Sequence, residues 1–284
     1  MKPLFFLLLA ITSVSSITAD EKPFTLFLDY NKVSPAKVHH PHKHHHEKFG
    51  FAEGRALALY THRFSEWGIR LGVGAMKTDM QWKGHHPFTK RHFTNALFSL
   101  GAYTTAIEKW VWDLNMSLQV NTQQFSSRYT FTRALLHGRY AWTKKAGLHV
   151  GLLGTAGMRY TTVLPVIGID YKRSKWQYNL VFPINISAFY SFTDNWSAGA
   201  ALRSFSSRQR MLKEDHLSRG LVLYRDVGLE LGVVYQLGDT ITANVHVGET
   251  LGGRVRVSNQ HNRDRKHYKL RPSPYFGLEF QLNF

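Results

Sequence analysis

Strict alternation of apolar and polar residues is the dominant pattern of this sequence. In its last eleven residues, PYFGLEFQLNF, every second position is apolar: Phe276, Leu278, Phe280, Leu282 and Phe284. Successive side chains of a β-strand point to opposite faces, so the segment predicts a strand with one fully apolar face.

The alternation recurs along the chain, at about 110–122, 147–160, 219–237 and 240–253, and no long helical period with caps interrupts it. Aromatic residues flank the short turns, as in YTHRFSEWG and YSFTDNWS. Tyr and Trp side chains suit the membrane interface, so the pattern favours strands that face lipid. The core of a soluble β-sandwich would produce the same alternation and is the alternative.

The number of strands follows from parity. Further strands are expected near 51–61, 67–78, 93–106, 128–142, 163–182 (a hairpin), 184–192, 195–206 and 272–284. This set is odd, whereas single-chain bacterial barrels close with an even number, and the segment KPFTLFLDY at 22–30 supplies one more strand. We therefore expect about 14 strands, or about 12 if 176–192 is one long strand. Pro183 favours the break, since proline removes a ladder hydrogen bond.

Short turns alternate with long polar connections near 31–50, 79–92, 207–219 and 254–271. With this asymmetry the chain resembles the bacterial outer-membrane β-barrel proteins over residues 20–284. The terminal strand is similar to the signal by which the barrel-assembly machinery recognises its clients, and PVIGIDYKRSKWQYNLVFP resembles the Pro-x-x-Gly-x-x-Tyr hairpin of uncharacterised outer-membrane families. The resemblance implies an all-β, closed antiparallel transmembrane β-barrel. It also implies contact with lipid and lipopolysaccharide in the outer membrane of a Gram-negative-type bacterium.

The N-terminus predicts export. Residues 1–19 contain one lysine, an apolar run from Leu4 to Ile11 and small residues leading to Ala19, which is the layout of a secretory signal peptide. The sequence has no cysteine, so disulfides cannot hold the exported chain together and a large sheet must do so.

The predicted lumen face carries charges of both signs. They are Arg70, Asp113, Arg133, Arg139, Arg159, Arg203 and Glu230. In a water-filled pore, an arginine-rich wall would favour anions. Alternatively, these side chains pair with one another and plug the interior.

The formal net charge is +17, and most of the excess falls in the long connections. The largest group, the predicted polyanion-binding residues, is Arg254, Arg256, Arg263, Arg265, Lys266, Lys269 and Arg271. Such a surface attracts polyanions, among them lipopolysaccharide phosphates and sulfated glycans, or it neutralises the anionic leaflet around the protein. No module that reads or stacks on bases is recognisable, so we expect no specific nucleic-acid partner.

A histidine-rich loop within 31–50 is the other distinctive feature. It contains His39, His40, His42, His44, His45 and His46, and imidazole-rich tracts bind zinc, copper or nickel. The spacing fits no defined site, so we expect no cofactor and at most adventitious binding of a divalent metal. A response to acid is a third interpretation, because histidine titrates near pH 6.5.

No catalytic motif emerges. The Gly-x-Ser-x-Gly elbow is missing, and His137, His149 and His246 fall in mid-strand, where a satisfied lumen histidine is the simpler explanation. The sequence therefore predicts a non-enzymatic, porin-like channel or surface structural protein with basic outer loops that bind anions. An adhesin for host polyanionic glycans is the alternative, and a metal-binding surface protein is a lesser one.

Overall fold

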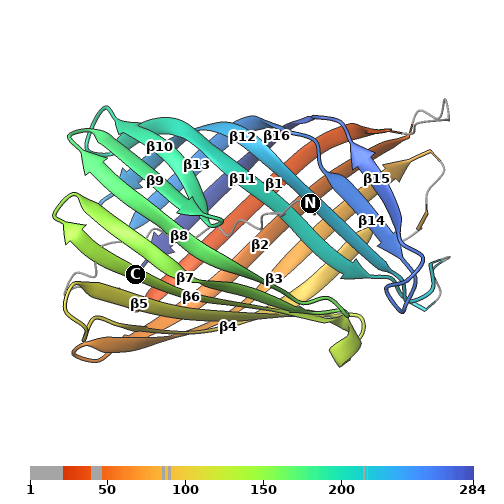
Figure 1. Cartoon of the computed structure of the whole chain (residues 1–284), viewed down its shortest axis with the longest axis horizontal. Coiled ribbons are helices and arrows are strands. Elements are labelled where there is room, and N and C mark those ends of the chain that lie inside the picture. Colours follow the sequence, from red (N-terminus) through yellow and green to blue (C-terminus); the bar gives the residue numbers. More distant parts are fainter. Residues whose placement is uncertain (1–21, 40–46, 85–86, 89–90, 214, 216) are drawn as a thin grey trace.

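The computed structural model describes residues 22–39, 47–84, 87–88, 91–213, 215 and 217–284, which form one antiparallel β-sheet closed on itself (Figure 1). Its only helical element within these residues is the single 3-10 turn η1 (Ser127–Tyr129). No helix in the described ranges is long and apolar enough to cross a bilayer.

The strands are β1 (Phe24–His39), β2 (Lys48–Arg63), β3 (Trp67–Lys83), β4 (His92–Thr104), β5 (Trp110–Asn121), β6 (Thr130–Thr143), β7 (Ala146–Gly157), β8 (Thr162–Arg173), β9 (Trp176–Phe182), β10 (Asn185–Ser191), β11 (Trp196–Arg210), β12 (Leu221–Leu237), β13 (Ile241–Thr250), β14 (Arg254–Ser258), β15 (Lys266–Leu270) and β16 (Pro274–Asn283). Consecutive strands pair from β1 to β13, and β16 closes the ring between β13 and β1. The hairpin β14–β15 continues the wall beyond β13 and β16, between β12 and β1.

The ring thus has 14 strands, which confirms the predicted closed antiparallel barrel. The alternative of 12 strands is wrong, because the chain breaks between β9 and β10 at Pro183, as expected. The two strands have only seven residues each, so the wall is low at this point.

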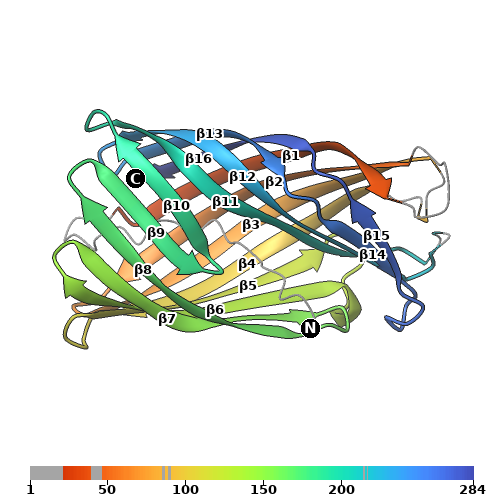
Figure 2. The ribbon, with the colours of Figure 1, turned by 45° about the horizontal axis from the view of Figure 1, so that its top comes forward.

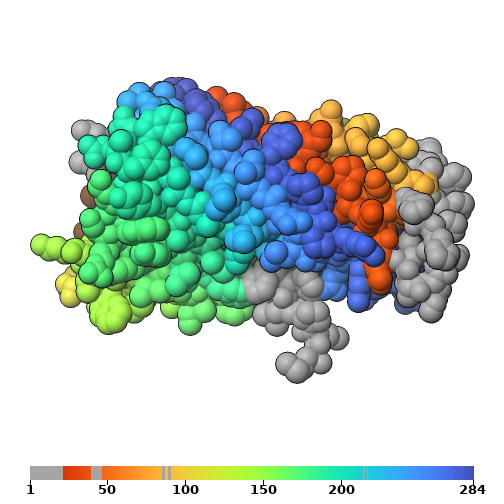
Figure 3. Space-filling view, turned by 90° about the horizontal axis from the view of Figure 1, so that it is seen from above, coloured from red at the N-terminus to blue at the C-terminus, as the bar shows by residue number. Residues whose placement is uncertain are grey.

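The two ends of the barrel differ (Figures 1 and 2). At the end that carries the C-terminus, which we call the turn end, short turns join the strands and the large aromatic residues Trp67, Trp142, Trp176 and Trp196 are exposed. This is the expected girdle. At the opposite loop end, the strands of the N-terminal region and the β14–β15 hairpin lie side by side (Figure 3).

Two of the four predicted long connections, 31–50 and 254–271, are largely strand in their described residues. β1 continues to His39 and β2 begins at Lys48, while β14 and β15 occupy most of the segment 254–271. The interpretation as loop is therefore wrong for residues 31–39, 48–50, 254–258 and 266–270, while residues 40–46 lie outside the described ranges. The reason is that the inward side chains of these strands, such as Val33, Val38 and Val255, are apolar and buried.

One part of the loop end crosses the barrel. Beyond Leu202, β11 pairs only with β12, because β10 is too short to reach it. We call residues 203–210 and 221–225, together with β14 and β15, the outer flap. Gln209 of the flap donates a hydrogen bond to Thr78 of β3 (3.4 Å), and Arg208 donates to the carbonyl oxygen of Gly157 on the other side of the barrel (2.8 Å).

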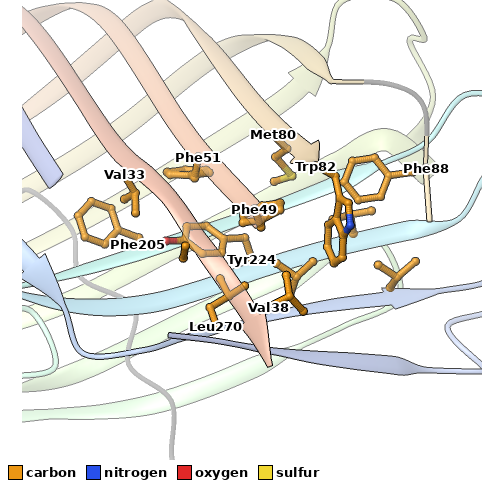
Figure 4. Close-up of a cluster of buried hydrophobic side chains, with 14 of the residues drawn as sticks. Val33, Val38, Phe49, Phe51, Met80, Trp82, Phe88, Phe205, Tyr224 and Leu270 are labelled. Carbon is orange, nitrogen blue, oxygen red and sulfur yellow. The ribbon is translucent and has the colours of Figure 1, made fainter. Parts of the chain in front are cut away.

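A hydrophobic core fills the space between the outer flap and β1–β3 (Figure 4). We call it the outer core; its largest members are Phe49, Phe51, Met80, Trp82, Phe88, Phe93, Phe205, Tyr224 and Tyr275. The ring centroid of Tyr224 lies 4.5 Å from that of Phe51 and 5.3 Å from that of Phe49. In the described residues, packed side chains therefore fill the loop end between the outer flap and β1–β3.

Candidate functional site

Below the outer core, the inner face of the barrel is polar, and its charges form pairs across the wall. Ion pairs join Arg55 to Asp29, Arg70 to Asp113, and Arg203 to both Glu230 and Glu279. Each partner projects from the inward face of its strand, because the period of two keeps side chains of equal parity on the same side. Four of the predicted lumen residues are thus paired, Arg70 with Asp113 and Arg203 with Glu230, whereas Asp29 and Arg55 were not among the predicted residues.

A second network crosses β6, β7 and β8. Arg139 donates two hydrogen bonds to Asp170 (2.7 and 2.8 Å), and His149 Nε2 lies 2.5 Å from the same carboxylate. The other ring nitrogen of His149 lies 2.7 Å from His137 Nε2. His246 Nε2 lies 3.0 Å from an asparagine oxygen of β1. All three mid-strand histidines thus have hydrogen-bond partners, in keeping with a structural role.

The remaining two predicted lumen residues differ in their positions. Arg133 faces the lumen from β6, with Glu53 as a charged neighbour. Arg159 does not belong to the wall. It follows the end of β7 in a left-handed turn conformation (φ 60°), and its Nη1 lies 3.0 Å from His261 of the β14–β15 turn.

Part of the lumen wall is accessible to solvent. The inward residues of β5, namely Asp113, Asn115, Ser117 and Gln119, are partly exposed, although they lie inside the ring. Beside β5, on β6 to β9, a small buried cluster that includes Leu135, Leu153 and Val181 narrows the interior. The lumen is therefore polar and partly accessible along β5, and the outer core lies between it and the loop end.

Outside the barrel, an arc of basic residues on β1, β2, β3 and the end of β15 lies beyond the apolar band. We call this the basic collar: Lys32, Lys37, Lys48, Lys77, Lys83, Lys269 and Arg271, all exposed. Within it, Lys48 is the cross-strand partner of both Lys37 and Lys83. Like charges directly opposite each other destabilise a sheet, so this row favours an anionic environment.

The predicted polyanion-binding residues do not form one loop. Arg254 and Arg256 lie on β14 and are half-buried, Lys266 and Lys269 lie on β15, and Arg263, Arg265 and Arg271 lie outside these strands. Arg208 and Arg225 of the outer flap share the face of Arg254 and Arg256. The sequence offered one signal for this face, since the pairs 208/210 and 254/256 are spaced by two residues.

The histidine tract and the signal peptide remain predictions. His39 is exposed at the end of β1, whereas His40, His42, His44, His45 and His46 lie outside the described residues, as do residues 1–19. Within the described part of the chain, no group of three or more metal-ligating side chains comes together.

The terminal strand has the expected geometry. Phe276 and Leu278 are 43 % and 49 % exposed on the outer face of β16. Phe284 directly follows the strand and is 59 % exposed, and its amide donates to the carbonyl oxygen of Phe24 (2.9 Å). The last residue therefore completes both the seam of the barrel and its apolar surface. Recognition by the assembly machinery stays a prediction.

Comparisons with known proteins agree with this architecture. No protein-family model matches the sequence. The chain is 26% identical over 281 residues to an uncharacterized protein of Chlamydia pneumoniae (93% of this chain, 88% of that one). It is also 26% identical over 212 residues to an uncharacterized protein of Chlamydia trachomatis (73% of this chain, 66% of that one). An outer membrane channel from Pseudomonas putida F1 is similar in structure, with a TM-score of 0.52 and 8% identity over 95% of this chain and 100% of the other. The fold is that of an outer-membrane β-barrel.

Proposed function

We propose that the chain is a porin-like channel in the outer membrane of a Gram-negative-type bacterium, and that its loop end is closed in the conformation described. The observation that carries the proposal is the polar, partly exposed inner face of β5, which lies next to the ion-paired wall. A polar lining is costly to bury without solvent or partners, so water in the lumen is the simplest occupant.

Opening requires the outer flap to move. Backbone hydrogen bonds between β11 and β12 hold the flap together. Its contacts to the opposite rim include side-chain hydrogen bonds, such as those donated by Arg208 and Gln209. Because Arg70, Arg139 and Arg203 are each paired with a carboxylate, we expect only a weak anion preference from the lumen itself. The basic collar would add attraction at the mouth.

The absence of cysteine offers a direct test. Ser117 faces the lumen from β5, and its neighbour Met116 faces outward and is 41 % exposed. In planar bilayers, we expect the purified protein to open in discrete steps. A charged thiol reagent applied to the Ser117→Cys variant should lower the conductance of each step and leave that of the Met116→Cys variant unchanged. A protein that inserts but never conducts, or two variants that respond equally, would contradict the proposal.

A second candidate, adhesion to polyanionic glycans, is favoured by the row Lys37, Lys48 and Lys83 in the basic collar. Retention on immobilised heparin by a protein that does not conduct would favour the adhesin. Replacing the three lysines with glutamine should then abolish retention. If the collar only neutralises the surrounding leaflet, the same variant should alter lipopolysaccharide binding and leave heparin retention unchanged.

A further inference from the structure

The outward face of the outer flap carries a compact group of arginines around one tyrosine. The guanidinium carbons of Arg208, Arg225 and Arg256 lie 4.8, 5.3 and 5.1 Å from the ring centroid of Tyr160. We call these four residues the Tyr160 cluster. The arginines come from β11, β12 and β14, whereas Tyr160 lies in the turn between β7 and β8.

The sheet register brings the arginines together. Arg208 and Arg256 are both cross-strand partners of Leu223, so they flank one position of β12 from either side. Arg225 follows two residues later on the same face and is opposite Arg254. Positions of equal parity on adjacent strands form a continuous surface, so the positive charges are held on rigid backbone.

The positive charge of the cluster is not balanced by carboxylates. In the described ranges, none of its three arginines forms an ion pair with Asp or Glu. Arg208 is only 8 % exposed, and its Nη1 donates to the carbonyl oxygens of Gly157 and Tyr160 (2.8 and 2.9 Å). The Nε atoms of Arg208, Arg225 and Arg256 are all buried and have no hydrogen-bond partner.

The cluster nevertheless stays cationic at neutral pH. Burial, followed by the charge of Arg225, lowers the pKa of Arg208 to about 10, which leaves the guanidinium protonated. Burial and the charges of Arg265, Arg225 and Arg254 likewise lower the pKa of Arg256. Buried charges of one sign are unfavourable unless a counter-charge and hydrogen bonds compensate them. An arrangement of this kind is therefore suited to a bound anion.

We infer that the Tyr160 cluster is a binding site for a phosphate or sulfate group. Guanidinium groups bind tetrahedral oxyanions through paired N–H donors, and three of them approaching from three strands suit a ligand with several charged oxygens better than a single carboxylate. The inference goes beyond the proposed channel and does not depend on conductance. The ligand would bridge the outer flap and the β7–β8 turn, because the four residues belong to both.

The first experiment measures the binding of inorganic phosphate to the purified full chain in detergent by titration calorimetry at constant ionic strength. Wild type should saturate. The Arg256→Gln and Arg225→Gln variants should each lose about tenfold or more in affinity, since a charge-assisted hydrogen bond is removed. Arg263→Gln is the matched control, because it removes the same charge from an exposed position on the β14–β15 turn. Its affinity should stay within about twofold of wild type, since exposed charges interact weakly.

The second arm identifies the source of the oxyanion. Intact lipopolysaccharide and a dephosphorylated preparation compete with inorganic phosphate for the wild-type protein. If inorganic phosphate binds and the intact lipopolysaccharide displaces it, the site recognises the phosphate group whatever its carrier. If only the intact lipopolysaccharide binds, the site recognises the lipid headgroup. Heat-modifiable mobility confirms that each variant is folded. Wild type that binds neither ligand, or folded Arg256→Gln and Arg263→Gln variants that lose affinity equally, would overturn the inference.

Discussion

The two halves of β3 place opposite chemistry on the same faces. Toward the turn end, Leu71 and Val73 point outward, 48 % and 60 % exposed, while Arg70 points inward to its ion pair. Toward the loop end the arrangement is reversed: Met80 and Trp82 point inward and are buried, and Lys77 and Lys83 point outward. In β1 and β2 the apolar face also switches from the outside to the inside at the same height along the barrel.

The reversal shows that alternation alone does not say which face is the inside. In the turn-end half, lipid surrounds the strands and water reaches the lumen, so the outer face is apolar. In the loop-end half, water surrounds the strands and the outer flap fills the interior, so the inner face is apolar. One continuous strand therefore serves first as a membrane barrel and then as one layer of a packed sandwich.

Of the changes that test this comparison, truncating a side chain of the outer core should cost the most stability. Phe51 is 4 % exposed and contacts Tyr224, so the Phe51→Ala variant should destabilise the loop-end half by about 3–5 kcal/mol. Phe98→Ala is the matched control, because Phe98 is 47 % exposed on the outer face. Limited trypsin digestion in vesicles should cleave the flap of the Phe51→Ala variant faster, with the barrel still heat-modifiable. Equal resistance of the two variants would mean that the outer core does not hold the flap.

The second-largest effect should come from a charge introduced on the outer face, which should cost stability in the turn-end half only. Leu71 lies midway between Trp67 and Ala75, the ends of the apolar outer stretch of β3, and the Leu71→Arg variant should lose about 2–4 kcal/mol. Gln81→Arg changes the same face of the same strand in the loop-end half and should cost almost nothing. Urea unfolding from lipid vesicles measures both. A similar loss at the two positions would show that lipid does not end between them.

The smallest change in the free energy of unfolding is expected at the seam, where β16 meets β1. A charge near the interface costs about 0–1 kcal/mol, so Phe284→Asp should leave the folded barrel nearly as stable as wild type and still insert poorly, because it damages the assembly signal. Phe24→Asp disrupts the same ring pair, whose centroids are 5.8 Å apart, but leaves the C-terminus intact. Outer-membrane levels in cells should fall for Phe284→Asp only. Equal outer-membrane levels of the two variants would mean that the loss of the Phe24–Phe284 ring contact, rather than damage to the assembly signal, causes the defect.

The fold class and the ring of 14 strands could be predicted because alternation, turn residues and the break at Pro183 are local signals. The loop-end strands were missed because a register shift between Val33 and Ala36 interrupts the period of two in β1. In β14, the alternation Arg-Val-Arg-Val is present, but its charge suggested a loop.

The sites were less predictable than the fold. The pair Arg139–Asp170 depends on register across three strands, and the Tyr160 cluster assembles residues from four separate segments. No local pattern encodes such distances. That the lumen histidines have hydrogen-bond partners could be predicted from their mid-strand positions, because a polar side chain inside a closed sheet must find a partner there.

The reversal along β3 also fixes the depth of the protein in its membrane. The basic collar resists being drawn into hydrocarbon from one side, and the aromatic residues of the turn end anchor the interface on the other. On β3 a single strand carries both boundaries, Trp67 at one end and Lys77 and Lys83 toward the other, so the barrel has little freedom to slide along the membrane normal. In a bilayer of a different thickness, the lipid around the protein, rather than the protein, would have to stretch or thin.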